Sequence, residues 1–455
     1  MERKNSFTEG PILAPLLKFT VPIMLALLLQ SMYGAVDMMI VGQFAGDAGS
    51  VSAVSTGSTM MNLPMMLVFG LTMGSTVLIG RRIGEEDYDG AGEIVGVSIA
   101  LFALVAVGIT ALMLALRHPF AKVMQVPPEA YDATIDYVTI CACGTIFIVG
   151  YNVISGVFRG LGNSTLPLVF VAIACVVNIF GDLLLVAVFH MGAAGAALAT
   201  VAAQAVSVAL SLVIIRRTKL PFRFQKRYVR LERNSVSLIL KLGSPIALQD
   251  TLTNVSFLVV NALINSMGVV TSAGYGIAQR VTGFILLIPS SFGSSMSAFV
   301  AQNMGARKPH RARRAMLYGM GTALCIGTVM FVLSFFFGDM LSMAFNRDPE
   351  IVRASAQYLK GFSFDCLMVS VLFCFIGYFN GCGKTVFVMA QGLVGALLVR
   401  MPFAIWMSLR PNPTLFSIGL ATPLASLTSI IMCVIYFRGA HARSLQDDAS
   451  GEIDN

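Results

Sequence analysis

Residues 18–42 read K-F-T-V-P-I-M-L-A-L-L-L-Q-S-M-Y-G-A-V-D-M-M-I-V-G. A helix of about 20 apolar residues crosses a bilayer, so this stretch is long enough to span one. It nevertheless contains a proline, Pro22, and a carboxylate, Asp37. A charged carboxylate inside a span is costly, and such residues commonly face a wet cavity and bind a proton, an ion or a substrate cation. The other interpretation places Asp37 at the outer interface with its carboxylate in water.

The composition is that of an integral membrane protein. Of the 455 residues, 56% are hydrophobic and only 12% are charged, whereas about a quarter of a soluble domain is charged. Because a spanning segment must satisfy its own backbone hydrogen bonds, the spans are expected to be helices. The net charge of +8 does not indicate nucleic-acid binding, since the basic residues lie in short runs between apolar segments. The eight cysteines and four histidines are scattered, so no disulfide scaffold, metal cluster or cofactor is predicted.

Twelve apolar segments, each of about the 20 residues that a span needs, follow one another along the chain. They are centred near residues 30, 65, 105, 147, 178, 204, 252, 288, 326, 367, 397 and 425. With the N-terminus placed in the cytoplasm, 23 of the 31 Lys and Arg residues fall in cytoplasmic pieces, 5 in outer pieces and 3 in or near spans. This asymmetry predicts a multi-pass protein of the plasma or inner membrane with both termini in the cytoplasm.

The two halves of the chain are related by a duplication. At an offset of 221 residues, V-L-I-G-R-R-I-G, ending at Gly84, meets A-F-V-A-Q-N-M-G, ending at Gly305. At the same offset F-R-G-L-G-N (158–163) meets F-N-G-C-G-K (379–384). An even number of spans in each copy makes the copies parallel. We therefore predict an all-α membrane protein with two parallel six-helix lobes, related by a pseudo-two-fold axis along the membrane normal.

This organisation divides the chain into four parts. They are an N-terminal lobe (1–215), a basic cytoplasmic linker (216–237), a C-terminal lobe (238–440) and a cytoplasmic tail (441–455). The basic run of the linker suits anionic lipid heads, but it also follows simply from the excess of positive charge in cytoplasmic loops. Two parallel lobes around a central cavity are typical of secondary transporters that rock between inward- and outward-open states, which is an inference from architecture alone.

Polar residues that occur in only one copy of the duplication point to a functional site. Asn178 and Asp182 are four residues apart and share a helix face, and Thr200 follows in a segment of small residues. The corresponding positions in the second half are apolar: Val399, Phe403, Ala421 and, opposite Asp37, Val260. Two carboxylates, an amide and a hydroxyl suit Na⁺, or a proton shared by two acids. The alternative is that Asn178 and Asp182 only hold helices together.

The whole chain resembles the multidrug and toxic compound extrusion (MATE) family. The most specific stretches are R-G-L-G-N-S-T-L-P-L, N-I-F-G-D and G-A-A-G-A-A-L-A-T, at residues 159–168, 178–182 and 192–200. The details resemble a bacterial and archaeal branch related to the DNA-damage-inducible protein F and to the staphylococcal MepA exporters. The resemblance implies a cation site for H⁺ or Na⁺ in the N-terminal lobe, made by Asp37, Asn178, Asp182 and Thr200. It implies no cofactor, no metal beyond Na⁺ at that site, and a monomer.

Two further residues of the first span are assigned by the same resemblance. Pro22 is expected to let the helix bend when Asp37 is protonated. Pro is also well tolerated in a first helical turn, and Pro245 recurs in the second half without a partner Asp, which favours a simple helix-entry role. Tyr33 lies four residues before Asp37 on the same helix face, where it is expected to support the cation site.

The second half departs from one family pattern. Another branch of the family has an acidic residue in the seventh helix, but in A-L-Q-D-T-L-T-N (247–254) the equivalent position is Thr253 and not Asp250. We therefore expect no cation site of that type in the C-terminal lobe. Four charged residues near its spans are candidates either for lining a cavity or for structural ion pairs such as Asp365–Arg400; they are Asp250, Arg280, Asp365 and Arg400.

The expected function is a secondary antiporter that exports hydrophobic, often cationic, organic compounds in exchange for H⁺ or Na⁺ by rocking-lobe alternating access. Its partners would be small-molecule drugs or metabolites and the lipid bilayer, with no nucleic acid. The methionines 60, 61, 65 and 66 could line an adaptable pocket, although such residues are more often core.

Two alternatives remain open at this point. A lipid-linked oligosaccharide flippase shares the broader architecture, but it should have a more cationic cavity for a pyrophosphate. An integral membrane transferase would need a catalytic acidic or His-Asp cluster. E-E-D-Y-D (85–89) is the only acidic cluster, and it is interpreted as a solvated loop, so no enzyme is predicted.

Overall fold

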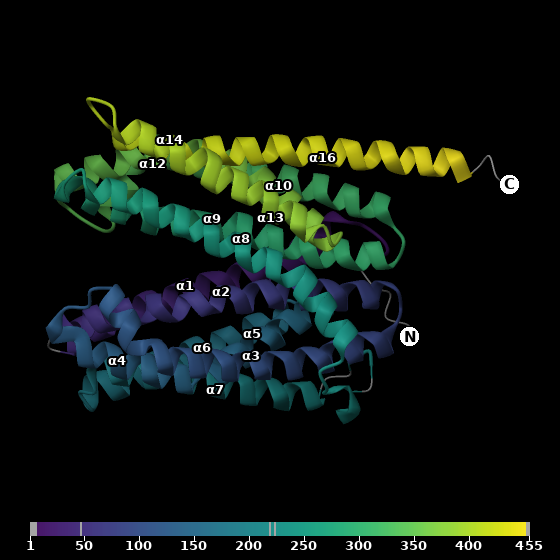
Figure 1. Cartoon of the computed structure of the whole chain (residues 1–455), viewed down its shortest axis with the longest axis horizontal. Helices are drawn as coiled ribbons and strands as arrows, with labels where there is room; N and C mark the ends of the chain where they lie inside the picture. The colour runs from purple at the N-terminus through teal and green to yellow at the C-terminus, as the bar shows by residue number, and fades with distance from the viewer. Residues whose placement is uncertain (1–6, 46–47, 218–219, 223, 452–455) are drawn as a thin grey trace. The chain divides into compact units, whose positions relative to one another are not determined.

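The computed structural model of the chain is helical in the part that it describes, residues 7–45, 48–217, 220–222 and 224–451 (Figure 1). No strand occurs among these residues. Eleven helices are long and apolar enough to cross a membrane, and a bent pair of shorter helices raises the number to as many as 12. Taken in chain order they coincide with the twelve predicted spans, so the all-α membrane class is confirmed.

The first half supplies six of these spans. Its elements are α1 (Leu13–Phe44), α2 (Ala48–Gly84), α3 (Tyr88–Val123), α4 (Pro128–Cys143), α5 (Thr145–Gly160), α6 (Thr165–Asp182), its π-helical continuation η1 (Leu183–Val188), and α7 (Gly192–Arg217). α4 and α5 form the bent pair, with an angle of 51° at the break. Gly144 lies at that break, and a Cβ there would overlap the Val201 side chain of α7. Glycine thus lets the bend lie directly against α7.

The second half begins after the short η2 (Lys226–Tyr228). Its elements are α8 (Arg233–Asn265), α9 (Val269–Gly305), α10 (Pro309–Phe336), α11 (Gly338–Met343), α12 (Pro349–Gly381), α13 (Thr385–Leu393), η3 (Val394–Arg400), α14 (Met401–Ser408), α15 (Leu415–Gly419) and α16 (Ala421–Gly451). Glu232 caps α8, because its carboxylate accepts the backbone N–H groups of Asn234 (3.1 Å) and Ser235 (2.6 Å). Hydrogen bonding from Ser235 lowers the pKa of this exposed carboxyl group.

The chain forms two compact units that do not follow the sequence halves strictly. The first runs to Thr251 and also includes Ser297–Ala315 and Asn380–Gly383. The second comprises Leu252–Met296, Met316–Phe379 and the chain from Lys384 onward. Helices α8, α9, α10 and α12 therefore each contribute residues to both units. The predicted boundaries of the lobes, linker and tail stay a prediction.

The duplication is visible in how glycines pack. A Cβ on Gly156 would overlap Thr72 of α2, and a Cβ on Gly377 would overlap Gly293 of α9. Both members of the second pair lie 221 residues after those of the first, the offset found in the sequence. Each glycine-rich turn also contains a residue in the left-handed conformation that favours glycine: Gly162 (φ 79°) and Gly383 (φ 76°).

Apolar packing accounts for three of the four methionines considered as pocket residues. Met60, Met61 and Met65 of α2 are buried in the hydrophobic core of the first half, together with residues of α3, α4 and α7. Their role there is to fill space between helices, as methionine often does. Met66 is half-buried.

Residues 7–11, at the start of the described chain, are fixed to the beginning of α10. The Arg311 guanidinium donates hydrogen bonds to four of their carbonyl oxygens: Phe7 (2.8 Å), Glu9 (2.9 Å), Gly10 (2.7 Å) and Pro11 (3.3 Å). The Phe7 ring also packs against Phe19 and Phe299, with centroids 5.0 and 4.8 Å apart. Lys308 Nζ donates to the Thr8 carbonyl (3.0 Å) and Asn303 Nδ2 to the Phe7 carbonyl (3.1 Å). Arg311 therefore makes most, but not all, of the side-chain hydrogen bonds that order this segment.

Replacing Arg311 with Ala should release this segment. Hydrogen bonds to a charged group are worth about 1.5–3 kcal/mol each when well formed, and solvent screening reduces that value at this partly exposed position. We expect glutamyl endopeptidase to cleave after Glu9 at least about tenfold faster in Arg311→Ala, measured by intact mass over time. The exposed Arg314 provides the control Arg314→Ala, which should cleave at the wild-type rate. Equal rates in all three proteins would show that Arg311 does not hold the segment.

Candidate functional site

Three packed helices of the first half bring the predicted cation-site residues together. Asp37 lies on α1, Asn178 and Asp182 lie on α6, and Thr200 lies on α7. α6 packs against both α1 and α7, and Figure 1 shows it running beside α7. Asp37, Asn178 and Asp182 are buried (6%, 1% and 0% exposed), and Thr200 is half-buried. The Asn178 amide donates a long hydrogen bond of 3.5 Å to the Thr200 hydroxyl.

The carboxyl groups of Asp37 and Asp182 are neighbours within interaction range. A hydrogen bond between two carboxyl groups requires that one of them carry a proton. Their contact is looser than a fully formed bond, because neither Asp182 oxygen reaches a hydrogen-bond partner of good geometry among the described residues. Two carboxylates this close repel one another when both are charged. The pair is therefore arranged to take up positive charge.

Buried acceptor atoms without donors are concentrated in this cluster. Five of the partnerless buried oxygens in the described part of the chain belong to these helices: Asp37 Oδ1, Asn178 Oδ1, both carboxylate oxygens of Asp182, and Gln204 Oε1. A buried acceptor left without a partner costs about 1–3 kcal/mol. A proton or a small cation bound among them would satisfy several of these atoms at once. We refer to Asp37, Asn178, Asp182, Thr200 and Gln204 as the acceptor cluster.

Gln204 is the member of the acceptor cluster that sequence reasoning missed. It is buried on α7 at 7% exposure, one turn after Thr200. The signal that could have found it is the spacing of Thr200 and Gln204, which repeats the i, i+4 spacing of Asn178 and Asp182. Tyr33 lies near the Gln204 side chain and within electrostatic range of Asp37. Tyr33 of α1 therefore lies beside the cluster.

The two prolines occupy helix interiors. Pro22 lies nine residues after the first residue of α1, Leu13, and Pro245 lies inside α8. Neither is a helix-entry residue, so the helix-entry interpretation is wrong. A proline inside a helix has no N–H to donate and leaves the carbonyl four residues earlier without its usual partner. The helix α1 continues through Pro22, and its bending remains a prediction.

α6 changes to a π-helix immediately after Asp182, over η1. π-helical turns are rare and occur frequently at functional sites. The Asp182 side chain thus projects from the last α-helical residue before a wider turn. In the second half the corresponding span also contains a π-helix, η3, which ends at Arg400.

The charged residues predicted for the second half do not form one site. Asp365 and Arg400 are both buried and lie within electrostatic range of one another. No Arg400 nitrogen lies within 4.0 Å of an Asp365 oxygen, so this pair is not a direct salt bridge. Arg280 is exposed, whereas Asp250 is half-buried in the part of α8 that belongs to the first unit.

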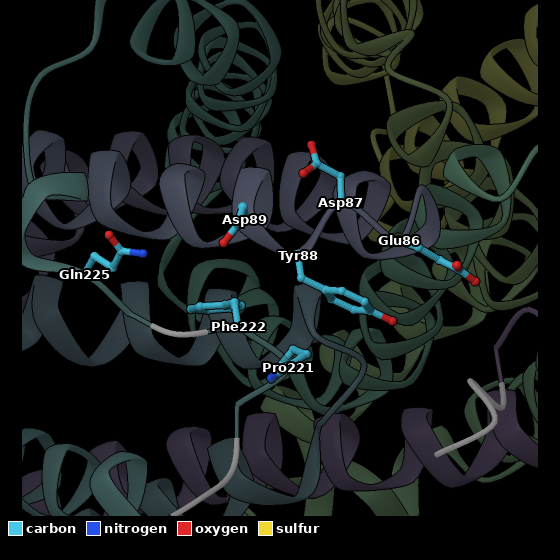
Figure 2. Close-up of a pocket in the computed structure, with 7 residues that line it drawn as sticks. All are labelled: Glu86, Asp87, Tyr88, Asp89, Pro221, Phe222 and Gln225. Carbon is cyan, nitrogen blue, oxygen red and sulfur yellow. The ribbon is translucent and has the colours of Figure 1, made fainter. Parts of the chain in front are cut away.

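The acidic loop at 85–89 lies beside a surface depression of about 510 Å³ (Figure 2). Arg82 pairs with Glu85 (3.2 Å) and Asp87 (3.0 Å) at partly exposed positions, and Asp87 caps α3 by accepting the Gly90 N–H (2.9 Å). Figure 2 shows the residues that line the depression: Glu86, Asp87, Tyr88, Asp89, Pro221, Phe222 and Gln225. None of the predicted site residues, all of which the structure describes, lines it.

Comparison with known proteins identifies the same internal repeat. The family model named MatE matches the chain twice, over residues 22–184 and 245–406. The two matches begin 223 residues apart, and at this offset Lys18 and Pro22 meet Lys241 and Pro245. Together they cover more than half of the chain.

Curated relatives match over nearly the whole length. The chain is 28% identical over 437 residues to the probable multidrug resistance protein YpnP of Bacillus subtilis (strain 168), covering 95% of this chain and 96% of the relative. It is 25% identical to the multidrug export protein MepA of Staphylococcus haemolyticus (strain JCSC1435), covering 85% and 86%. A solved structure described as an outward-facing multidrug resistance MATE family transporter of the MOP superfamily has a TM-score of 0.90 at 19% identity, covering 97% and 99%. This last likeness concerns the fold.

Because the acceptor cluster lacks hydrogen-bond donors, Asp182→Asn is expected to stabilise the protein, although most substitutions of buried residues destabilise it. The substitution removes a buried charge and supplies an N–H donor to acceptors that lack one, so it should stabilise the fold. We expect the apparent Tm in detergent, at pH 8 without sodium, to rise by roughly 2 °C or more, since about 1 kcal/mol shifts Tm by a few degrees. Asp136, exposed on α4, provides the control Asp136→Asn, with no change expected. A lower Tm for Asp182→Asn would contradict the assignment of unsatisfied acceptors.

Proposed function

We propose that this chain, which belongs to the MatE family, is a secondary antiporter that exports hydrophobic, often cationic, organic compounds in exchange for H⁺ or Na⁺. Relatives named as multidrug resistance and multidrug export proteins, matched over most of their length, support the export of such compounds. The observation that supports coupling of drug export to an ion is the acceptor cluster. Its buried oxygens outnumber the donors available to them, and it lies on three helices of one half.

The chemistry of the acceptor cluster suits both candidate ions. Carboxylate, amide and hydroxyl oxygens are the hard ligands that Na⁺ prefers, and the flexible Gln204 side chain adds one more. A proton shared by Asp37 and Asp182 would remove their mutual repulsion equally well. In this proposal the ion is a transported substrate. The residues of α1, α6 and α7 hold it and respond to its charge.

The ion would act by changing the cost of closing the helices around the carboxylates. With both carboxylates charged, the cluster favours an arrangement that admits water. Once neutralised, α1, α6 and α7 can approach more closely, and α1 has a weak point at Pro22 where it can bend. Drug export follows if the ion and the drug prefer different states of the protein, because a ligand shifts an equilibrium only by its differential affinity.

We also propose the cellular setting that this function requires. The protein would lie in the plasma or inner membrane with both termini in the cytoplasm, as the distribution of Lys and Arg predicts, and would work as a monomer. The family match supports a transporter and gives no support to the transferase alternative. The flippase alternative would be favoured if a lipid-linked pyrophosphate, and no organic cation, were transported.

Transport by purified protein in liposomes tests the proposal directly. We expect ethidium movement driven by an imposed pH gradient or by an imposed Na⁺ gradient. Asp37→Asn should lose at least about 90% of the driven rate, because it removes one of the two carboxylates that sense the ion. The control Asp136→Asn, at an exposed carboxylate of the same half, should keep the wild-type rate.

The outcomes separate the coupling mechanism from the substrate class. Wild-type rates in Asp37→Asn under either gradient would refute ion coupling through the acceptor cluster. If the wild type moves no ethidium under either gradient, the multidrug substrate class is wrong.

A further inference from the structure

The second compact unit contains a buried guanidinium whose charge has no direct ion pair. Arg400 ends η3 and is 8% exposed. Its Nη1 donates a hydrogen bond of 2.9 Å to the Ser256 hydroxyl of α8. Its Nε is buried and has no hydrogen-bond partner among the described residues. An ionisable residue inside a span is costly and is therefore a sign of function.

The contacts of Arg400 leave one particular edge of the guanidinium available. The Phe257 ring lies 4.1 Å from its Cζ and covers one face. Ser256 occupies Nη1. In the described part of the chain no hydrogen bond is made by Nε or Nη2 of this residue. The edge formed by these two nitrogens is one that binds a carboxylate or phosphate with two parallel hydrogen bonds.

Asp365 presents a complementary feature from a neighbouring helix. It lies on α12 at 1% exposure, within electrostatic range of Arg400 and near the Ser426 side chain of α16. Its Oδ1 has no hydrogen-bond partner among the described residues. The two side chains therefore offer an unused donor edge and an unused acceptor atom in the same lobe.

Aromatic hydroxyl groups complete the surroundings. Tyr275 of α9 and Tyr358 of α12 are buried, with ring centroids 4.9 Å apart and ring planes at 80°. Both lie within electrostatic range of Arg400. Tyr275 is hydrogen-bonded to Gln279. Both rings belong to the buried hydrophobic cluster of this unit, so their hydroxyl groups are polar edges of an otherwise apolar region next to Arg400.

From these contacts we infer that Arg400 and Asp365 form a substrate subsite for organic zwitterions that carry a carboxylate. The carboxylate takes the Nε–Nη2 edge of Arg400, and a cationic nitrogen approaches Asp365 Oδ1. This inference rests on the proposed export function, and it concerns residues separate from the acceptor cluster. At the offset of 221 the counterparts of Asp365 and Arg400 are Gly144 and Ile179. The charged pair therefore occurs only in the second half.

Two dyes that differ only at the carboxyl group provide a matched probe. Rhodamine 110 carries a free carboxylate and a delocalised cation, and rhodamine 123 is its methyl ester. We would measure the binding of each dye to purified protein in detergent by fluorescence anisotropy, without any ion gradient. We expect Arg400→Gln to weaken rhodamine 110 binding at least tenfold and to change rhodamine 123 binding by less than twofold.

Three other variants sharpen the test. Arg400→Lys keeps the positive charge but loses the planar guanidinium group. It should therefore weaken the binding of rhodamine 110 several-fold and leave the binding of rhodamine 123 unchanged. Asp365→Asn should weaken the binding of both dyes, because both dyes carry the cationic ring system. Arg353→Gln, at an exposed arginine near the start of α12, should change the binding of neither dye. If Arg400→Gln does not elute as a single species in size-exclusion chromatography, the binding of the two dyes is compared between Arg400→Lys and the wild type instead.

The outcomes distinguish this inference from the proposed function. Equal weakening of both dyes in Arg400→Gln and Arg400→Lys, or no weakening of either dye, would assign Arg400 a structural role and overturn the subsite. Failure of the wild type to transport both ethidium and rhodamine 123 in liposomes, with carboxylate-selective binding intact, would instead overturn the proposed export and leave the subsite standing.

Discussion

The burial of two carboxyl groups among too few hydrogen-bond donors is the constraint on which the first half depends. A helix inside a bilayer satisfies its own backbone except at a proline, so most of its unsatisfied polar atoms are side-chain atoms. Asp37 and Asp182 belong to different helices, and each has buried oxygen without a donor in the described chain. A bound proton or cation would supply what these acceptors lack, which is why we propose the acceptor cluster as the ion site.

Close helix packing is what allows the cluster to exist. A Cβ on Gly181 would lie only 3.0 Å from the Ala199 Cβ, so α6 and α7 approach closely beside Asp182 and Thr200. The small residues of 192–200 serve the same purpose near the start of α7, and further along Ser207 of α7 donates a hydrogen bond to the Phe170 carbonyl of α6 (3.1 Å). Small residues at helix interfaces are the usual means of association inside membranes, where lipid provides no hydrophobic driving force between helices. The apolar part of the sequence thus sets the distance at which its few polar groups meet.

Much of this arrangement is predictable from sequence, because it depends on length, periodicity and repetition. The twelve spans follow from hydropathy, and the polar set on α1, α6 and α7 follows from comparing the two halves. Contacts that depend on how each helix is rotated about its axis cannot be predicted in this way. Gln204 joins the cluster because α7 turns that face toward Asn178, and Arg400 meets Ser256 and Phe257 across 144 residues of sequence. The position of Pro22 within its helix could not be predicted from the sequence either. The structure begins α1 at Leu13, five residues before Lys18, so the proline lies in the helix interior.

The duplication explains how one scaffold can serve two different ligands. The glycines that fix helix distances recur at the offset of 221, as with Gly156 and Gly377, so both copies keep the same framework. What differs is the chemistry of the groups that lie together. The acceptor cluster of the first half contains two carboxyl groups and no cationic side chain, which favours a proton or cation. The second half pairs an unused guanidinium edge with an unused carboxylate oxygen, which favours a molecule carrying both charges. Because neither set has a counterpart at the equivalent positions of the other half, each can change its ligand without disturbing the contacts that hold the helices together.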